Sequence, residues 1–301
     1  MSRVLIAGAS GLIGTALRQH PQIRAVTVST VSRGVLPEPG HWTVDLTDSD
    51  EAQRVVRASR PDVIFLLAGG TGGDRLDLYS RNILPTVNIM SAVGDMEPVP
   101  YCLVLGSASE YGEGTGTPIG EDTPLQPLSP YGRAKLAQTT LAQSLAARFG
   151  IPLTVVRPFN AVSPHLTPAT ALGNMKTQLV EQTGSRRSVT CGRLDVVRDY
   201  IHLGFLVEVL VALMTHPLPG TVINACSGTG IRLEDVLQAM GRLLEVEVEV
   251  SIDEALAGIP AADVVVGDPR HLETSLGLTH RPTAHGIAAL MLGMSDTVSS
   301  G

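Results

Sequence analysis

Three closely spaced glycines near the start of the chain constrain its fold more than any other feature. The apolar run Val4–Ala7 predicts a buried strand, and Leu12–Gln19 has the pattern of a helix. The segment between them reads Gly8-Ala-Ser-Gly11-Leu-Ile-Gly14. Glycines let the backbone turn tightly and approach a bound group, and the helix that follows offers free N–H groups to an anion. This strand, turn and helix predict a dinucleotide site whose pyrophosphate contacts are Gly8, Gly11, Leu12, Ile13 and Gly14.

Apolar runs alternate with helical patterns through the rest of the first half. Short strands rich in Val, Ile and Leu are expected at Ala25–Val31, Val63–Ala68, Cys102–Leu105 and Leu153–Val156. Helices are expected at Asp48–Ser59, Asp77–Val93 and Ser129–Phe149. Strands that lack polar alternation are buried on both faces, as in a parallel sheet. Residues 1–160 are therefore expected to form an α/β, doubly wound parallel Rossmann sheet that carries the cofactor and the catalytic residues.

The pattern loosens after Pro158, where Val162–Gly173 is rich in Pro, Thr and Ala and predicts a loop. Helices are expected at Asn174–Gln182, Leu203–Met214 and Leu233–Leu244, and short strands at Val189–Cys191, Val222–Asn224 and Val246–Ile252. This half supplies too few consecutive strands for an independent sheet. Residues 161–301 are therefore expected to form a small C-terminal substrate lobe, interleaved with the Rossmann sheet and covering its open end. Residues 294–301 are expected to be frayed.

Composition limits the cellular compartment and the classes of binding partner that we expect. The 301 residues are 44% hydrophobic and 17% charged, and no apolar stretch approaches the roughly eighteen residues that span a bilayer. The start does not read as a secretory signal, so we expect a cytoplasmic protein without membrane contacts. Cys102, Cys191 and Cys226 match no metal-ligand spacing, and no metal is expected. The net charge of −7 leaves no basic surface for nucleic acid, so local arginines and N–H groups must hold any anionic substrate.

The end of the second strand indicates which nicotinamide cofactor is bound. An acidic residue there binds a ribose 2′-hydroxyl, whereas arginine accommodates a 2′-phosphate. This chain has Val31-Ser32-Arg33-Gly34 and no acidic residue. Ser32 and Arg33 therefore favour NADP(H), with NAD(H) possible if Arg33 is only an exposed loop residue. Further along the chain, adenine contacts are expected at Asp45 and Leu46, and a close passage of the cofactor over a strand end at Leu67, Ala68 and Gly69.

A tyrosine and a lysine lie four residues apart in Tyr131-Gly-Arg-Ala-Lys135, which places them on one helix face. A nearby ammonium favours the phenolate, so Lys135 is expected to lower the pKa of Tyr131. Ser107 follows the strand Cys102–Leu105 and can orient the same substrate oxygen. The alternative is a solvated helix face, although the chain has only two lysines. Pro130 fixes the helix start, with Ser129 as its cap.

Taken together, these segments resemble the extended short-chain dehydrogenase/reductases, the NAD-dependent epimerase/dehydratase family, over nearly the whole chain. The resemblance also rests on five further motifs: Glu121-Asp-Thr-Pro124, Ser129-Pro-Tyr-Gly132, Arg157-Pro-Phe-Asn160, Arg198-Asp-Tyr-Ile-His202, and Gly267-Asp-Pro-Arg270 leading to Leu276-Gly-Leu278. It implies that Tyr131, Lys135 and Pro158 contact the cofactor. It also implies substrate contacts at Ser109, Asn160, Asn174, Arg198 and Arg232, with Arg198 on the phosphates. The alternative for Arg198 is a structural ion pair with Asp199 or another carboxylate.

Within this family, sugar 4,6-dehydratases carry an acidic acid–base residue immediately after the catalytic Ser or Thr. Here Ala108 and Ser109 hold the corresponding positions and Glu110 comes one place too late, which argues against dehydration. The run Gly106–Gly112 is more similar to nucleotide-sugar 4-ketoreductases. One departure is Leu203-Gly204-Phe205 after His202, where the family usually has an acidic residue; it weakens an assignment to a subfamily.

The resemblance implies an NADP(H)-dependent reduction of the C4 keto group of a nucleotide-linked 4-keto-6-deoxy sugar. Tyr131 would protonate the developing alkoxide, Ser107 would bind the carbonyl oxygen, and Lys135 would contact the nicotinamide ribose. One alternative is a nucleotide-sugar 4-epimerase that retains its NAD. An alternative from another class is a non-catalytic NADP-sensing protein. A homodimer is also implied, paired through Asp77–Val93 and Ser129–Phe149, unless their apolar faces are covered within one chain.

Overall fold

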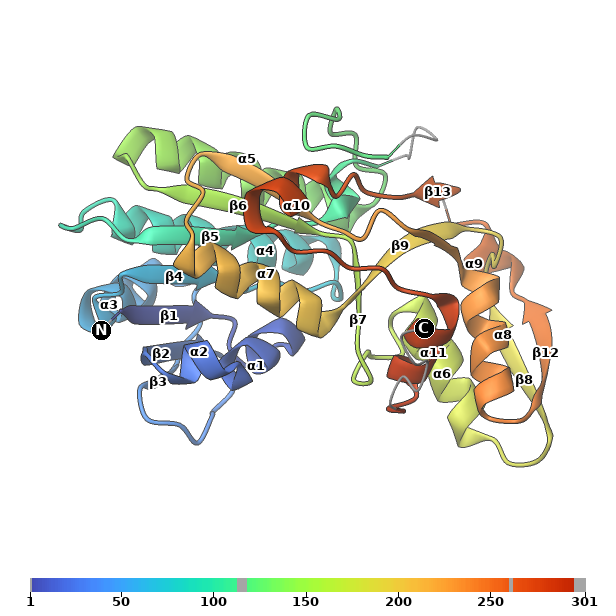
Figure 1. Ribbon diagram of the computed structural model, residues 1–301. Helices are drawn as coiled ribbons and strands as arrows, with labels where there is room; N and C mark the ends of the chain where they lie inside the picture. Colours follow the sequence, from blue (N-terminus) through green and yellow to red (C-terminus); the bar gives the residue numbers. More distant parts are fainter. Residues whose placement is uncertain (1, 113–117, 260–261, 295–301) are drawn as a thin grey trace.

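The computed structural model describes residues 2–112, 118–259 and 262–294, which form a large α/β unit with a smaller lobe at one end (Figure 1). The large unit is built on a parallel sheet of seven strands, in the order β10-β6-β5-β4-β1-β2-β3. Its strands are β1 (Arg3–Ala7), β2 (Thr27–Ser32), β3 (His41–Thr43), β4 (Val63–Leu66), β5 (Tyr101–Leu105), β6 (Leu153–Pro158) and β10 (Thr221–Ala225). This is the doubly wound Rossmann sheet that the sequence predicts. The strands expected in the first half are confirmed with small shifts at their ends, whereas the short β3 was missed.

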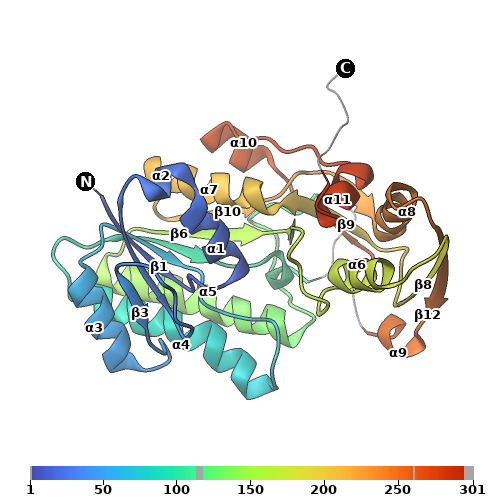
Figure 2. The same cartoon turned by 90° about the horizontal axis from the view of Figure 1, so that it is seen from below.

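Helices cover both faces of this sheet, as Figure 2 shows. One face packs against α1 (Leu12–Gln19), α2 (Pro21–Arg24), α7 (Leu203–Thr215) and α10 (Arg270–Leu276). The other face packs against α3 (Ser49–Ser59), α4 (Arg75–Val93) and α5 (Pro130–Phe149). The single-turn η1 (Ala108–Glu110) follows β5. Burial on both faces explains why these strands read as continuous apolar runs.

Side-chain caps set the helix starts. The Asp48 carboxylate accepts hydrogen bonds from the N–H groups of Asp50 and Glu51, and the Ser129 hydroxyl accepts one from Gly132. Both residues therefore cap their helices from outside. The expected starts at Asp48 and Ser129 are one residue early, while the predicted role of Ser129 as a cap is confirmed.

The second half of the chain contributes to both parts of the structure. β10 pairs in parallel with β6 at the edge of the large sheet, and α7 and α10 pack on that sheet. The remaining segments form the lobe around its own apolar core: α6 (Ala171–Glu181), α8 (Leu233–Leu243), α9 (Glu254–Ala257), α11 (Ala284–Met291) and the strands given below. Of the expected frayed end, residues 295–301 lie outside the described residues.

Within the described residues the lobe contains two small sheets, both built from strands that are not consecutive in the chain. One pairs β12 (Glu247–Ile252) with β8 (Arg186–Cys191). The other joins β7 (Asn160–Val162), β9 (Val197–His202), β11 (Gly230–Arg232) and β13 (Val264–Val265). Three of these strands have two or three residues, which is too short for a periodic signal. Their pairing depends on partners that are distant in the sequence.

Two further observations bear on the expectations above. Leu84 on α4 and Leu141 on α5 keep 39% and 41% of their surface exposed; the homodimer through these helices stays a prediction. No helix in the described ranges has both the length and the apolar character needed to cross a bilayer.

Candidate active site

The glycine-rich turn lies where the direction of strand order reverses, between β1 and β4, which is where sheets of this type bind ligands. Gly8 has a φ of +90°, and a Cβ atom there would lie 2.7 Å from the Ala68 nitrogen. A Cβ on Gly14 would lie 2.4 Å from the Gly8 carbonyl oxygen. Gly11 stands just before α1, and no described side chain caps the first turn of that helix. The turn therefore has the shape and the free donors that a pyrophosphate requires.

The loop after β2 presents the groups expected to select the cofactor. Ser32 is buried and its hydroxyl donates to the Gly34 carbonyl at 2.8 Å. The neighbouring Arg33 is exposed. Its guanidinium is therefore accessible to a phosphate beside the end of β2.

Two asparagines on α4, which the sequence analysis missed, hold the other loops of this crevice. Asn88 donates to the carbonyls of Leu46 and Thr47 at 2.9 and 3.0 Å, so it fixes the loop in which Asp45 and Leu46 lie. Asn82 donates to the Gly70 carbonyl at 2.9 Å and pins the turn after β4, next to Leu67, Ala68 and Gly69. Such side-chain amides bonded to loop backbone have no local sequence signature.

Ser107 and Tyr131 are brought together from two elements. Ser107 caps η1 at the carboxyl end of β5, and Tyr131 lies in the first turn of α5. Their side chains are hydrogen-bonded to each other, and the Ser107 oxygen also accepts the Ser109 N–H at 3.1 Å. The two hydroxyls therefore form one polar pair.

Lys135 lies one turn below Tyr131 and is buried. Its ammonium donates to the Leu105 carbonyl and to the side-chain oxygen of Gln138, whose amide donates to Thr86 at 2.7 Å. Burial lowers the pKa of Lys135 to about 8, and the charge of Glu110 opposes this shift. Lys135 is thus anchored beneath the end of β5.

The pKa of Tyr131 departs from the sequence-based expectation. Burial raises it above its usual value, the hydrogen bond from Ser107 lowers it, and the charge of Glu110 raises it again. The expected lowering by Lys135 is not found, because the ammonium is directed to Leu105 and Gln138. Tyr131 is therefore a phenol at neutral pH, a proton donor rather than a base.

Glu110 is fully buried and does not line the cleft that the described residues form. Its carboxylate turns back under the loop, where it binds the Ser107 N–H and Arg157. It cannot exchange protons with a ligand in the cleft. This geometry agrees with the expectation that Glu110 does not act as a dehydratase acid–base group.

A cleft of about 610 Å³ opens between the large sheet and the lobe, with Ser107, Ser109 and Tyr131 at one end. Asn160 and Arg198 lie in its wall, on β7 and β9. Asn160 donates to the Asp199 carbonyl at 2.9 Å, which joins these two strands. Several of the residues expected to contact the substrate thus line one cavity.

Arg198 keeps its charge available for a ligand. Its guanidinium donates to the carbonyls of Val197 and Asp263, and no described carboxylate pairs with it. Asp199 is instead taken up by backbone and hydroxyl donors of Ser227, Gly228 and Gly267. Burial lowers the pKa of Arg198, which marks a partly desolvated cation that an anion would stabilise.

Of the two remaining residues expected to contact the substrate, Asn174 lines the cleft and Arg232 does not. Asn174 lines the cleft from α6, with its side-chain oxygen bonded to Gln178. Arg232 is exposed just before α8 and does not line the cleft within the described residues. The sequence analysis missed Arg193, which lines the cleft but is paired with Asp195 and Asp263. It also missed the apolar part of the wall, which includes Leu166, Leu172, Met175, Leu233 and Leu256.

Comparison with known proteins finds similarity to proteins named as nucleotide-sugar reductases and epimerases. The chain is 25% identical to a GDP-6-deoxy-D-mannose reductase of Pseudomonas aeruginosa, over 84% of each protein. Its fold matches the structure of RMD from Pseudomonas aeruginosa complexed with NADPH, with a TM-score of 0.83, 23% identity and coverage of 97% and 98%. It also matches the UDP-glucose 4-epimerase of Thermus thermophilus in complex with NAD, with a TM-score of 0.82, 21% identity and the same coverage.

The family match covers more than half of the chain. A model of the NAD dependent epimerase/dehydratase family matches residues 4–226, which include the glycine turn, Ser107, Tyr131, Lys135 and Arg198. The resemblance stated from the motifs is therefore confirmed. This chain belongs to the NAD dependent epimerase/dehydratase family, whose members are enzymes built on the extended short-chain dehydrogenase/reductase fold.

Proposed function

We propose that this protein uses NADPH to reduce the C4 keto group of a nucleotide-linked 4-keto-6-deoxy sugar. The observation that carries the proposal is the Ser107–Tyr131 pair at one end of the cleft, with Glu110 turned away from it. The pair can bind and protonate a carbonyl oxygen, and no carboxylate at this position can remove water from the sugar. The name of the reductase relative, at 25% identity, supports the same substrate class.

The residues of the crevice fit a nicotinamide dinucleotide. The turn at Gly8 and Gly14 and the uncapped start of α1 would hold the pyrophosphate. Arg33 and Ser32 would hold a 2′-phosphate, which favours NADPH over NADH. When bound, NADPH supplies the hydride that reduces C4.

The chain's own groups handle the proton. Ser107 binds the carbonyl oxygen and holds it beside the Tyr131 phenol. As charge develops on that oxygen, Tyr131 transfers its proton to it, and the Ser107 hydrogen bond strengthens. Because burial keeps Tyr131 protonated at neutral pH, the acid required for reduction is the resting form.

Arg198 would bind the nucleotide diphosphate, since it lines the cleft and its guanidinium has no carboxylate partner in the described residues. Asn160 and Asn174 offer polar groups in the same wall. This placement leaves the sugar to extend toward Ser107 and Tyr131.

The test is to supply purified protein with NADPH and GDP-4-keto-6-deoxymannose, and then with the dTDP- and UDP-linked 4-keto-6-deoxy sugars. Consumption of one NADPH for each alcohol formed, abolished in Tyr131→Phe, is the expected result. Interconversion of nucleotide-sugar 4-epimers without net consumption of NADPH would instead identify an epimerase. Cofactor binding without turnover of any of these compounds would favour the NADP-sensing alternative.

A further inference from the structure

The Glu110 carboxylate is a buried charge that the mechanism above does not use. Its side chain is 0% exposed and that of its ion-pair partner Arg157 is 4% exposed. A buried ion pair is expensive to desolvate, and it persists when further hydrogen bonds satisfy its remaining atoms. Glu110 meets this condition with two donors besides Arg157, and the three donors come from three different segments.

Two of the three donors belong to the segments that carry the catalytic residues. Oε1 of Glu110 accepts the backbone N–H of Ser107 at 2.8 Å, which closes the capping box of η1. Oε2 accepts the hydroxyl of Thr139 at 2.9 Å, and Thr139 lies on α5 one turn beyond Lys135. Oε2 also accepts Nε of Arg157, on β6, at 2.9 Å.

We propose that Glu110 is a positioning residue, whose carboxylate clamps the loop of Ser107 to α5 and β6 and thereby sets the spacing of Ser107, Tyr131 and Lys135. The inference rests on the proposed function of this site, because the spacing matters through the proton transfer. Glu110 does not touch the substrate; it acts through Ser107 and through α5.

The contacts of Glu110 with Arg157 and Thr139 depend on a glycine beside them. A Cβ atom on Gly106 would lie 2.6 Å from Oε1 of Glu110 and 3.2 Å from side-chain carbons of both Arg157 and Thr139. Because Gly106 has no Cβ atom, the side chains of Glu110, Arg157 and Thr139 have room to meet there.

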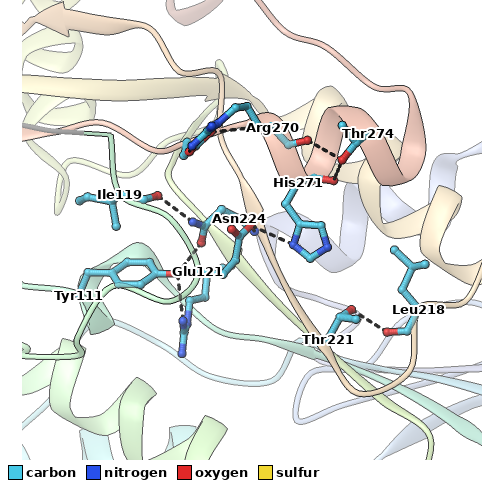
Figure 3. A network of polar contacts seen from close by, with 11 residues as sticks. Tyr111, Ile119, Glu121, Leu218, Thr221, Asn224, Arg270, His271 and Thr274 are labelled. Carbon is cyan, nitrogen blue, oxygen red and sulfur yellow. Dashed lines mark hydrogen bonds and ion pairs between the residues drawn. The ribbon is translucent and has the colours of Figure 1, made fainter.

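The clamp is itself anchored to the edge of the sheet. Nη1 of Arg157 donates to the Tyr111 hydroxyl at 2.9 Å, and Tyr111 donates to Oδ1 of Asn224, on β10, at 2.7 Å. Figure 3 shows Tyr111 directed at Asn224, which is also bonded to Ile119 and Glu121. The orientation of Arg157 is therefore fixed from both ends, and the position of Glu110 with it.

The Glu110 carboxylate also shifts the pKa values of two catalytic residues. The charged groups of this cluster are Glu110 on η1, Lys135 on α5 and Arg157 on β6, with Tyr131 as the neighbouring titratable phenol. The charge of Glu110 raises the pKa of both Lys135 and Tyr131. Removing the charge of Glu110 is therefore expected to lower the pKa of Lys135 and the pKa of Tyr131.

The first experiment loosens the clamp without changing its charge. Thr139→Val removes one hydroxyl in a side chain of the same shape, and Thr139→Ser keeps the hydroxyl. We expect Thr139→Val to lower kcat roughly tenfold with KM unchanged, as small displacements in an active site do. Thr139→Ser restores most of the rate. An unchanged kcat in Thr139→Val, or an equal loss in both variants, contradicts the proposal.

The second experiment uses the fact that the chain has only two lysines, Lys135 and Lys176. Protein with isotope-labelled lysine side chains gives two NMR signals, which Lys176→Arg assigns. The wild-type Lys135 is expected to titrate with a pKa of about 8. Glu110→Gln is expected to lower this pKa, whereas Thr139→Val, which keeps the charge, leaves it in place. An unchanged pKa of Lys135 in folded Glu110→Gln overturns the electrostatic part of the proposal.

The NMR titration requires no substrate, so the two proposals fail separately. If no keto sugar is turned over but Glu110→Gln lowers the pKa of Lys135, the proposed function is wrong and the coupling of Glu110 to the site remains. If keto sugars are reduced but neither variant behaves as expected, the clamp is wrong and the function remains. Should Glu110→Gln fail to fold, the Thr139 pair still decides the positioning role.

Discussion

The side chains of Ser107 and Tyr131 are hydrogen-bonded to each other across the end of the cleft, one from the cap of η1 and one from the first turn of α5. This pair offers two hydroxyls to a single substrate oxygen. Burial holds the pKa of Tyr131 above its usual value, which suits an acid that protonates an alkoxide. The predictions below follow from this pair and the groups around it.

Tyr131→Phe removes the proton donor and keeps the ring. We expect kcat for reduction to fall by about 10²- to 10⁴-fold, the usual contribution of general acid catalysis, while NADPH still binds. Tyr101→Phe is the matched control, because it also removes a buried phenol, bonded to Thr154 at 2.7 Å, at the opposite end of β5. Its cost is the two hydrogen bonds of that hydroxyl, to Thr154 and from the Leu218 N–H, about 2 kcal/mol of stability, without loss of kcat. Steady-state kinetics and thermal unfolding of both variants test this; equal losses of kcat would contradict it.

We expect the rate of reduction to depend on pH through Lys135, whose ammonium would hold the nicotinamide ribose of the bound cofactor. Burial lowers its pKa to about 8, so the ammonium form predominates below that pH and is lost above it. The raised pKa of Tyr131 keeps the phenol protonated over the same range. We therefore expect kcat to be level near neutral pH and to decline as the pH rises through about 8. A kcat profile that stays flat well above this value argues against a role for the ammonium.

Arg198→Ala is expected to weaken substrate binding more than the chemical step. Loss of a charge-assisted contact to the diphosphate corresponds to roughly a 10- to 100-fold increase in KM, with a smaller change in kcat. Arg232→Ala is the control, because Arg232 is exposed and does not line the cleft in the described structure. Its KM should stay within about twofold of the wild-type value, as expected for surface substitutions. A larger effect of Arg232→Ala would mean that the substrate lies differently.

Arg33→Ala tests the selection of the cofactor. The exposed guanidinium beside the end of β2 is expected to bind the 2′-phosphate, so its removal should weaken NADPH about 10- to 100-fold. The affinity for NADH, which has no such phosphate, should change little. Binding titrations of both nucleotides measure the ratio, and a parallel loss for both would show that Arg33 does not read the phosphate.

The parts of the site that could be predicted from the sequence are those formed by residues close together in the chain. The glycine turn is recognisable because Gly8 and Gly14 leave no room for a Cβ atom. Tyr131 and Lys135 are fixed by their spacing along one helix. By contrast, the direction of the shift in the pKa of Tyr131 was wrong, because it depends on burial and on the bonding of Lys135 to Leu105 and Gln138.

The features that sequence reasoning missed depend on partners distant in the chain. The edge position of β10 follows from its pairing with β6, and the small sheets of the lobe come from strands too short to show a period. That Glu110 is not a dehydratase residue stays a prediction, and its position under Ser107 depends on Arg157 and Thr139, neither of which is its neighbour in the sequence.

The most direct test of the central claim is to titrate the purified protein with NADPH and NADH, after checking for nucleotide that copurifies. The account predicts that NADPH binds more tightly than NADH and exchanges freely with the solution, as a reductase requires. NAD that copurifies and does not exchange would contradict it, because an enzyme that keeps its cofactor returns the hydride to the substrate and acts as an epimerase.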